Sequence, residues 1–167
     1  MTTLVRGRVW KFGDDVDTDA MAPWNTISLP WEERRKAVLQ TRPELVERVA
    51  PGDVIVAGRN WGCGSSREHA PENLKLLGLG GVVAESFGRI YFRNCVAIGF
   101  PNLACPGVAT AFEEGDEIEF DVRTGVVRNR TRDLELRADP YTDDMLRIVE
   151  QGGLLEVLRK RLARERA

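Results

Sequence analysis

The chain is poor in the residues on which disulfide-rich, metal-binding and membrane proteins depend. Its 167 residues include three cysteines and one histidine, and the cysteines do not follow the spacing of a disulfide framework or of paired zinc ligands. No apolar run approaches the roughly 20 residues that a membrane helix needs, and the N-terminus lacks the basic-then-apolar order of a signal peptide. We therefore expect a cytoplasmic protein with no membrane segment and no metal ligands of its own.

An excess of either charge is also missing. Lys and Arg number 24 against 26 Asp and Glu, a net charge of −2, whereas nucleic-acid binding usually requires a basic excess. The exception is residues 157–167, which hold five basic residues and one acidic residue. Such a run is typical of the solvated end of a helix, with docking of a partner as the alternative. We expect no nucleic-acid partner.

What the sequence does contain is typical of an ordinary globular protein. Hydrophobic residues make up 43% and charged residues 30%, and a chain of this length can bury a core without covalent or metal crosslinks. We expect a single domain over residues 1–167, with a helical C-terminal tail at residues 141–167.

Short apolar runs separated by helical patterns predict a parallel sheet in the first two thirds of the chain. The expected strands are residues 5–12, 54–57, 82–85 and 102–104. Helices are expected to begin at Ser65-Ser66 and at Ser86. Residues 20–50 form a long excursion with a helical middle at residues 31–40, and long irregular connections are often functional loops.

The second half of the chain has a different pattern. Residues 117–123 alternate between apolar and charged side chains, the period of a strand with one solvated face. Thr124-Gly125 is typical of a hairpin turn, and a helix capped by Thr142 follows later. The fold class that we expect is α/β, a mixed sheet with a parallel centre and an antiparallel, β-rich second half.

The segment from Gly62 to His69 joins an expected buried strand to an expected helix. Glycines allow close backbone approach, and the free amides of a helix's first turn bind anions. Two serine hydroxyls and the guanidinium of Arg67 would add to such a site, which predicts a carboxylate or phosphate pocket. The alternative is structural: Ser65 or Ser66 caps the helix, with Glu68 completing a capping box.

Other catalytic motifs fit this segment poorly. The flanking glycines of a serine-hydrolase elbow, the Gly-Lys-Ser/Thr of a phosphate loop and the last glycine of the dinucleotide fingerprint are all missing. His69, the single histidine, lies on the same expected helix as the serines. A lone histidine in that position is more often a packing residue than a base.

Three ordered motifs carry a family resemblance. The Ser-Ser-Arg triplet within residues 64–71, the Asp-Thr-Asp triplet at residues 17–19 and the motif at residues 86–94 together resemble the aconitase superfamily. The length is similar to that of its stand-alone small subunits. The resemblance is strong over residues 7–107 and looser elsewhere.

This resemblance implies a swivelling β/β/α domain and a hydro-lyase that moves a hydroxyl on a small di- or tricarboxylic acid by dehydration and rehydration. Ser65 would be the base, Ser66 and Arg67 would hold a substrate carboxylate, and Asp19 would support the site. The resemblance places no cofactor on this chain. It implies a [4Fe-4S] cluster on a separate large subunit, where iron acts as a Lewis acid.

The chain departs from the family pattern in the loop that follows Asp-Thr-Asp. Residues 20–29 carry no charged side chain, whereas the family often has an arginine there. Trp24, Ile27 and Leu29 would suit an apolar substituent, unless they belong to the core. This favours isopropylmalate or another alkyl-malate over citrate-like acids. A homoaconitase-type or dimethylmalate-type small subunit and a non-catalytic acid-binding module are the alternatives.

Overall fold

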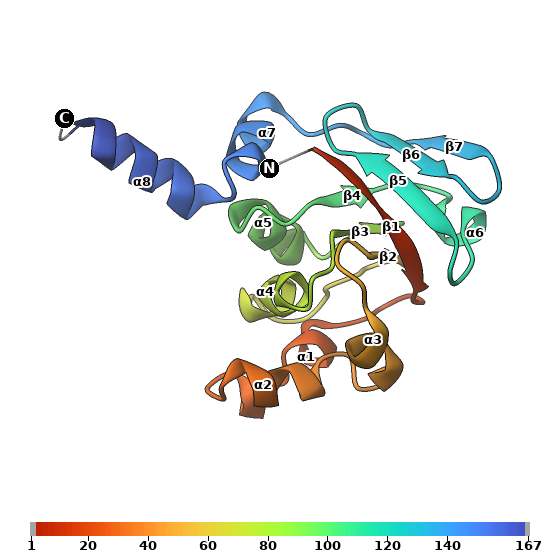
Figure 1. Ribbon diagram of the computed structural model, residues 1–167, viewed down its shortest axis with the longest axis horizontal. Helices are drawn as coiled ribbons and strands as arrows, with labels where there is room; N and C mark the ends of the chain where they lie inside the picture. Colours follow the sequence, from red (N-terminus) through yellow and green to blue (C-terminus); the bar gives the residue numbers. More distant parts are fainter. Residues whose placement is uncertain (1–2, 166–167) are drawn as a thin grey trace.

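The computed structural model describes residues 3–165 (Figure 1). Its elements along the chain are β1 (Leu4–Lys11), α1 (Thr18–Met21), the 3-10 helix η1 (Trp24–Thr26), α2 (Trp31–Arg34), the 3-10 helix η2 (Arg35–Ala37), α3 (Pro43–Arg48), β2 (Val54–Ala57), α4 (His69–Leu76), β3 (Gly81–Ala84), α5 (Arg89–Ala97), β4 (Asn102–Ala104), α6 (Val108–Ala111), β5 (Glu117–Asp121), β6 (Val126–Asn129), β7 (Leu134–Arg137), α7 (Asp143–Glu150) and α8 (Leu154–Glu165).

The strands of the described residues form one sheet in the order β4-β3-β2-β1-β5-β6-β7. Strands β1 to β4 pair in parallel, and β5 to β7 pair antiparallel. β1 joins the two halves, because its end pairs with β2 at Val9–Lys11 and its beginning pairs antiparallel with β5 at Leu4–Arg8. The expected mixed sheet, parallel in the centre and antiparallel in the second half, is confirmed.

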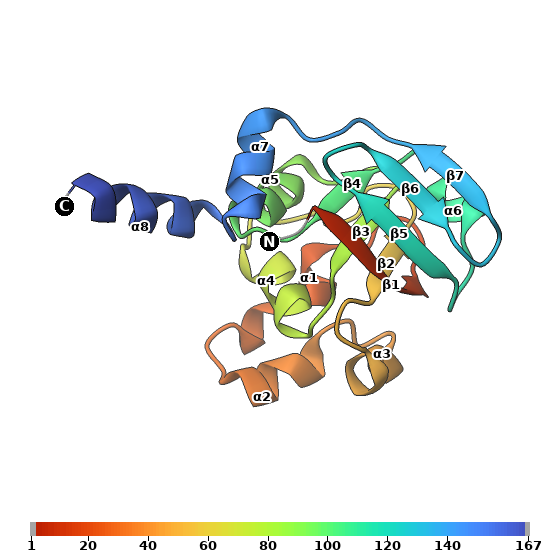
Figure 2. The same ribbon diagram turned by 45° about the horizontal axis from the view of Figure 1, so that its top comes forward.

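The central strands β2 and β3 are buried on both faces, which explains why they are continuous apolar runs instead of alternating ones. In β2, Ile55 and Ala57 contribute to a core cluster under α1, α4 and α5, whereas Val54 and Val56 contribute to a second cluster with Phe120 and the inner face of α7. All four β2 residues are 0% exposed. Helices α1 to α4 lie together on one side of these strands (Figures 1 and 2).

Two helices begin three residues later than the sequence predicts. α4 begins at His69 instead of Ser65-Ser66, and α5 begins at Arg89 instead of Ser86. The proposed capping box is also wrong, because Glu68 is the N-cap residue of α4 and no side chain caps it. In both cases hydrogen bonds to distant parts of the chain hold the serines in extended loops.

The excursion over residues 20–50 is anchored to the core. The expected helix at residues 31–40 is wrong in extent: α2 ends at Arg34, a 3-10 turn follows, and Leu39 has a φ of +49°. Leu39 N donates to Ala20 O at 2.7 Å. Val38, Leu39 and Leu45 are all 0% exposed in the cluster that includes Ile55.

The helical tail consists of α7 and α8, with Arg166 and Ala167 outside the described residues. Thr142 caps α7 as expected. α8 extends away from the rest of the molecule (Figures 1 and 2), and none of its described residues is buried. Its leucines are the large exposed apolar side chains Leu154, Leu155, Leu158 and Leu162. Within residues 3–165, the structure contains no helix with the length and apolarity that crossing a membrane would require.

Removal of α8 tests how much this helix contributes to the fold. A chain that ends at Gly153 should lose about 1 kcal/mol or less of its free energy of unfolding, because no described α8 residue is buried. Urea denaturation measures the change. The control, Phe120→Ala, removes a fully buried ring and should cost about 3–5 kcal/mol. A truncation as damaging as this control would contradict the independence of α8.

Candidate functional site

Three loops meet at the carboxyl ends of parallel strands β1, β2 and β3. The loop after β1 pairs with the loop after β2 through a bridge between Asp17 and Cys63, and the loop after β2 pairs with the loop after β3 through a bridge between Trp61 and Phe87. In open α/β sheets this edge is where ligands bind. The structure therefore brings together the three motifs that the sequence separates by many residues.

Two glycines allow the central loop to lie against the start of α5. Gly62 has a φ of +73°, and a Cβ on it would lie 2.2 Å from the ring of Tyr91. A Cβ on Gly88 would lie 2.6 Å from the carbonyl oxygen of Gly62. Because neither position has room for a side chain, the glycines fix how closely the loop at residues 62–65 approaches α5.

Ser65 is half-buried and lies directly over Thr18. The two hydroxyl oxygens are 3.1 Å apart, and the backbone N–H of Ser65 donates to Thr18 Oγ1, also at 3.1 Å. Thr18 is itself 1% exposed, and its N–H donates to the carbonyl of Cys63 at 2.9 Å. These bonds satisfy a buried hydroxyl and hold Ser65 in a fixed position.

An open pocket of about 350 Å³ adjoins Ser65. Its lining combines the loop after β2 with the first turns of α5: Gly62, Cys63, Gly64, Ser65, Gly88, Arg89, Ile90 and Arg93. The helix start at this pocket belongs to α5. The anion site expected at the start of the helix after Ser65 is therefore replaced by a pocket at the start of the next helix.

Arg67 and Asp19 form an ion pair beside this pocket. Arg67 Nη1 also donates to the carbonyl of Ala22 at 2.8 Å, and its guanidinium lies 5.8 Å from the ring centroid of Trp24. No described residue bonds to Nε or Nη2, so these two nitrogens remain available to an anion. The structure thus unites Arg67 and Asp19 but places neither in the lining of the Ser65 pocket.

Ser66 and the loop of residues 20–29 complete this flank of the site. Ser66 is exposed, and its carbonyl accepts a hydrogen bond of 3.2 Å from Asn94 Nδ2 of α5. Trp24 is 76% exposed and Leu29 is 37% exposed. Of the two alternatives for these apolar side chains, core packing is therefore wrong for Trp24 and Leu29.

The three cysteines show neither a reactive thiol nor a metal site. Burial, reinforced by the carboxylates of Asp17 and Asp15, raises the pKa of Cys63 in the pocket. Burial also raises the pKa of Cys95 and that of Cys105, the latter to about 11. Residues 3–165 contain no group of three or more His, Cys, Asp or Glu side chains that could hold a metal ion. The side chains of the described residues therefore do not fit an iron–sulfur cluster.

Three residues at the site could not be assigned a role from the sequence: Thr18, Arg89 and Arg93. Thr18 was part of a recognised triplet but had no role, because nothing in the sequence shows that it lies under Ser65. Arg89 and Arg93 were part of a recognised motif and line the pocket. The sequence contains a pattern that could have indicated an anion site there. Two arginines lie four residues apart at the start of a helix whose first turn has no acidic residue.

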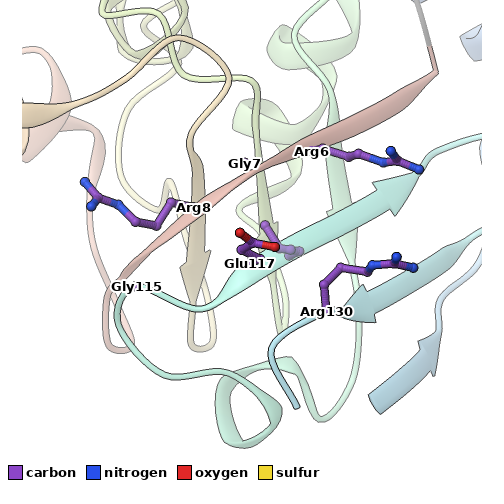
Figure 3. A pocket seen from close by; sticks show the side chains of 7 residues that line it. Arg6, Gly7, Arg8, Gly115, Glu117 and Arg130 are labelled. Carbon is purple, nitrogen blue, oxygen red and sulfur yellow. The ribbon is translucent and has the colours of Figure 1, made fainter. Parts of the chain in front are cut away.

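A larger hollow, of about 500 Å³, lies elsewhere, over the junction of β1 and β5 (Figure 3). Arg6, Arg8, Glu117 and Arg130 line it, and it has no hydroxyl or thiol in its lining. Arg6 pairs with Glu119, the residue opposite it in the strand register. The lining of this hollow contains none of the residues that the sequence motifs single out.

Fold and site together define an α/β domain of the aconitase C-terminal type, with a serine at the carboxyl edge of its parallel strands. The family model of the aconitase C-terminal domain matches residues 33–106. The chain belongs to the aconitase superfamily, among its small subunits. It is 49% identical over 162 residues to the 3-isopropylmalate dehydratase small subunit 1 of Methanopyrus kandleri, covering 96% of this chain and 95% of that protein.

Other relatives extend the same similarity. The methanogen homoaconitase small subunit of Methanothermobacter thermautotrophicus is 47% identical over 159 residues, covering 93% of this chain and 91% of that one. A crystal structure of 3-isopropylmalate dehydratase from Methanocaldococcus jannaschii superposes with a TM-score of 0.87 at 33% identity, covering 97% of each chain. The small-subunit resemblance drawn from the motifs is confirmed.

Substitution of Gly88 tests the construction of the site. Gly88→Ala should lower the free energy of unfolding by about 1–3 kcal/mol, because its Cβ would lie 2.6 Å from a backbone oxygen that other bonds hold in place. Gly13→Ala is the matched control, since a Cβ there meets nothing within 4 Å. Chemical denaturation of both variants is the measurement. Equal stability of the two variants would show that the loop is not fixed by this contact.

Proposed function

We propose that this chain is the small subunit of a 3-isopropylmalate dehydratase, a hydro-lyase that moves a hydroxyl between neighbouring carbons by dehydration and rehydration. The observation that carries the proposal is the Ser65 hydroxyl, which adjoins an open pocket and rests on a buried threonine. Full-length similarity to small subunits of that name supplies the substrate class. The exposed apolar side chains of Trp24 and Leu29 favour a substrate with an alkyl group.

In this proposal Ser65 removes the proton beside a substrate carboxylate. A serine hydroxyl is a weak base unless its deprotonated form is stabilised. Thr18 Oγ1 already accepts the N–H of Ser65, so the threonine's own O–H is free to donate to Ser65 Oγ. A hydrogen bond to a charged oxygen is roughly twice as strong as a neutral one. Thr18 thereby favours the deprotonated serine.

The pair of Arg67 and Asp19 would hold a second substrate group on the flank. Asp19 and the Ala22 carbonyl occupy Nη1, which fixes the plane of the guanidinium. Nε and Nη2 then present a fork that matches a carboxylate. The exposed hydroxyl of Ser66 lies next in the chain and would add a further donor. The hydroxyl and guanidinium groups that the fold leaves available support the proposal that Ser66 and Arg67 bind substrate.

The proposal requires a partner. The relatives are named small subunits, and the [4Fe-4S] cluster implied by the aconitase resemblance would belong to the large subunit, since the described residues offer it no ligands. Both subunits would work in the reducing cytosol. Co-purification is a simple test: the chain should bring down a brown, oxygen-sensitive protein, whereas a non-catalytic acid-binding module would not.

A homoaconitase small subunit is the second candidate, because a relative of that name is 47% identical over nearly the whole chain. A substrate panel separates the candidates. We expect the complex with the large subunit to turn over 3-isopropylmalate with the highest kcat/KM, with dimethylmalate below it and homocitrate lowest. Ultraviolet absorbance of the unsaturated intermediate measures each rate. A preference for homocitrate would replace the first candidate with the second.

Two hydroxyl deletions test the base. Ser65→Ala should abolish turnover and leave subunit assembly intact, and Thr18→Val should lower kcat about 10- to 100-fold, the effect of one hydrogen bond to a charged group. Thr26→Val is the matched control, because its buried hydroxyl donates to the Pro23 carbonyl instead, at 2.7 Å. It should keep kcat within about twofold. Near-normal activity of Ser65→Ala would refute the assignment.

A further inference from the structure

Two arginines with no assigned role border the pocket beside Ser65. Arg89 and Arg93 line it together with Ile90 and the loop of residues 62–65. The arginines are four residues apart on α5, so their side chains leave the same face of the helix one turn apart. Both residues are exposed, and both also border a second, more apolar hollow on the far side. The pair therefore forms one wall of the Ser65 pocket.

Neither guanidinium has an anionic partner within the described part of the chain. Most other arginines do, for example Arg42 with Glu44 and Glu114, Arg59 with Asp14, and Arg128 with Glu119 and Glu135. Between residues 3 and 165, no hydrogen bond or ion pair involves the side chain of Arg89 or Arg93. Two cations face the pocket with their charge uncompensated.

The position of the two arginines is unfavourable for the helix itself. Arg89 is the first residue of α5, at the positive end of the helix dipole, and the first turn holds no acidic residue to offset it. Like charges one turn apart on a helix also repel each other. An anion bound between the two guanidiniums would remove both penalties. The arrangement therefore favours binding of an anion between Arg89 and Arg93.

We propose that Arg89 and Arg93 bind the substrate carboxylate attached to the carbon that Ser65 deprotonates. The inference rests on the proposed function and deepens it. When the C–H bond breaks, the proton passes to Ser65 Oγ and the electron pair spreads from the carbon into its carboxylate. Guanidinium groups placed at that carboxylate stabilise the charge as it develops. The pair shares its pocket with Ser65, as this role requires.

The two ends of the substrate then have different cationic partners. Arg67 does not line the Ser65 pocket and forms an ion pair with Asp19 on the flank. We therefore assign Arg67 to the other carboxylate of the substrate. The uncharged loop at residues 20–29 supplies no arginine. Arg89 and Arg93 on helix α5 would supply the cationic groups that this loop lacks.

Binding to an inactive complex tests this assignment. The large subunit is assembled with the Ser65→Ala chain, and calorimetry measures the Kd of 3-isopropylmalate and of 2-hydroxy-4-methylpentanoate, which lacks the carboxylate in question. Adding Arg89→Gln or Arg93→Gln should weaken binding of 3-isopropylmalate about tenfold each, the effect of a lost charged hydrogen bond. Binding of the monocarboxylate should change by less than about threefold. Arg147→Gln, on the exposed face of α7, is the control.

Three results for the Arg89→Gln and Arg93→Gln variants would overturn the inference. The Kd of 3-isopropylmalate could stay unchanged, or the Kd of both acids could rise equally. Alternatively, the variants could bind the large subunit less well while the complex that still forms binds 3-isopropylmalate with unchanged Kd. The last would identify the arginines as subunit contacts. Failure of the proposed function looks different, since the wild-type complex would then not convert 3-isopropylmalate at all. Arg93→Lys separates charge from shape: it should recover only part of the affinity, because an ammonium lacks the planar fork.

Discussion

The contact between Thr18 and Ser65 is the interaction on which the site depends. A buried hydroxyl must be satisfied, and Thr18 achieves this by accepting the Ser65 N–H and bonding to the Ser65 hydroxyl. The same contact fixes the loop after β1 against the loop after β2. Parallel pairing of β1 and β2 makes this contact possible, because it brings both loops to one edge of the sheet. Thr18 thus connects the parallel pairing of β1 and β2 to the position of Ser65, the proposed base.

The parts of the fold that sequence alone predicted are those determined by burial. β2 at Val54–Ala57 lies where the short apolar run predicts it, and β3 at Gly81–Ala84 lies within one residue of its predicted position. A parallel strand buried on both faces is apolar throughout, so its sequence is recognisable. The predicted starts of α4 and α5 are wrong because these starts depend on hydrogen bonds to distant residues and not on burial. Ser86 accepts hydrogen bonds from Asn60 and Trp61, and Asn94 reaches Ser66. Local capping preferences cannot anticipate partners that lie 25 or more residues away.

The residues of the site also divide into those that local sequence predicts and those that depend on distant contacts. Ser65 could be chosen from sequence because glycines and a serine pair after a strand form a recognisable local pattern. Thr18 could not be assigned a role, because its function comes from a neighbour 47 residues away. Arg89 and Arg93 are an intermediate case. Their unfavourable charge at a helix start is a local signal, but its meaning depends on the pocket beside Ser65, whose loop and helix Gly62 and Gly88 allow to pack closely together.

In the proposed function, the groups brought together here form one side of a reaction site. The Ser65 pocket is open, Ile90 in its wall is 51% exposed, and Trp24 on the flank is 76% exposed. Hydrogen bonds and charges of the kind proposed for Thr18 and Arg89 act strongly where water is excluded. The proposed base role of Ser65 therefore requires a second surface that covers this edge. The exposure of these groups in the isolated chain is what the proposed role of the protein as a subunit predicts.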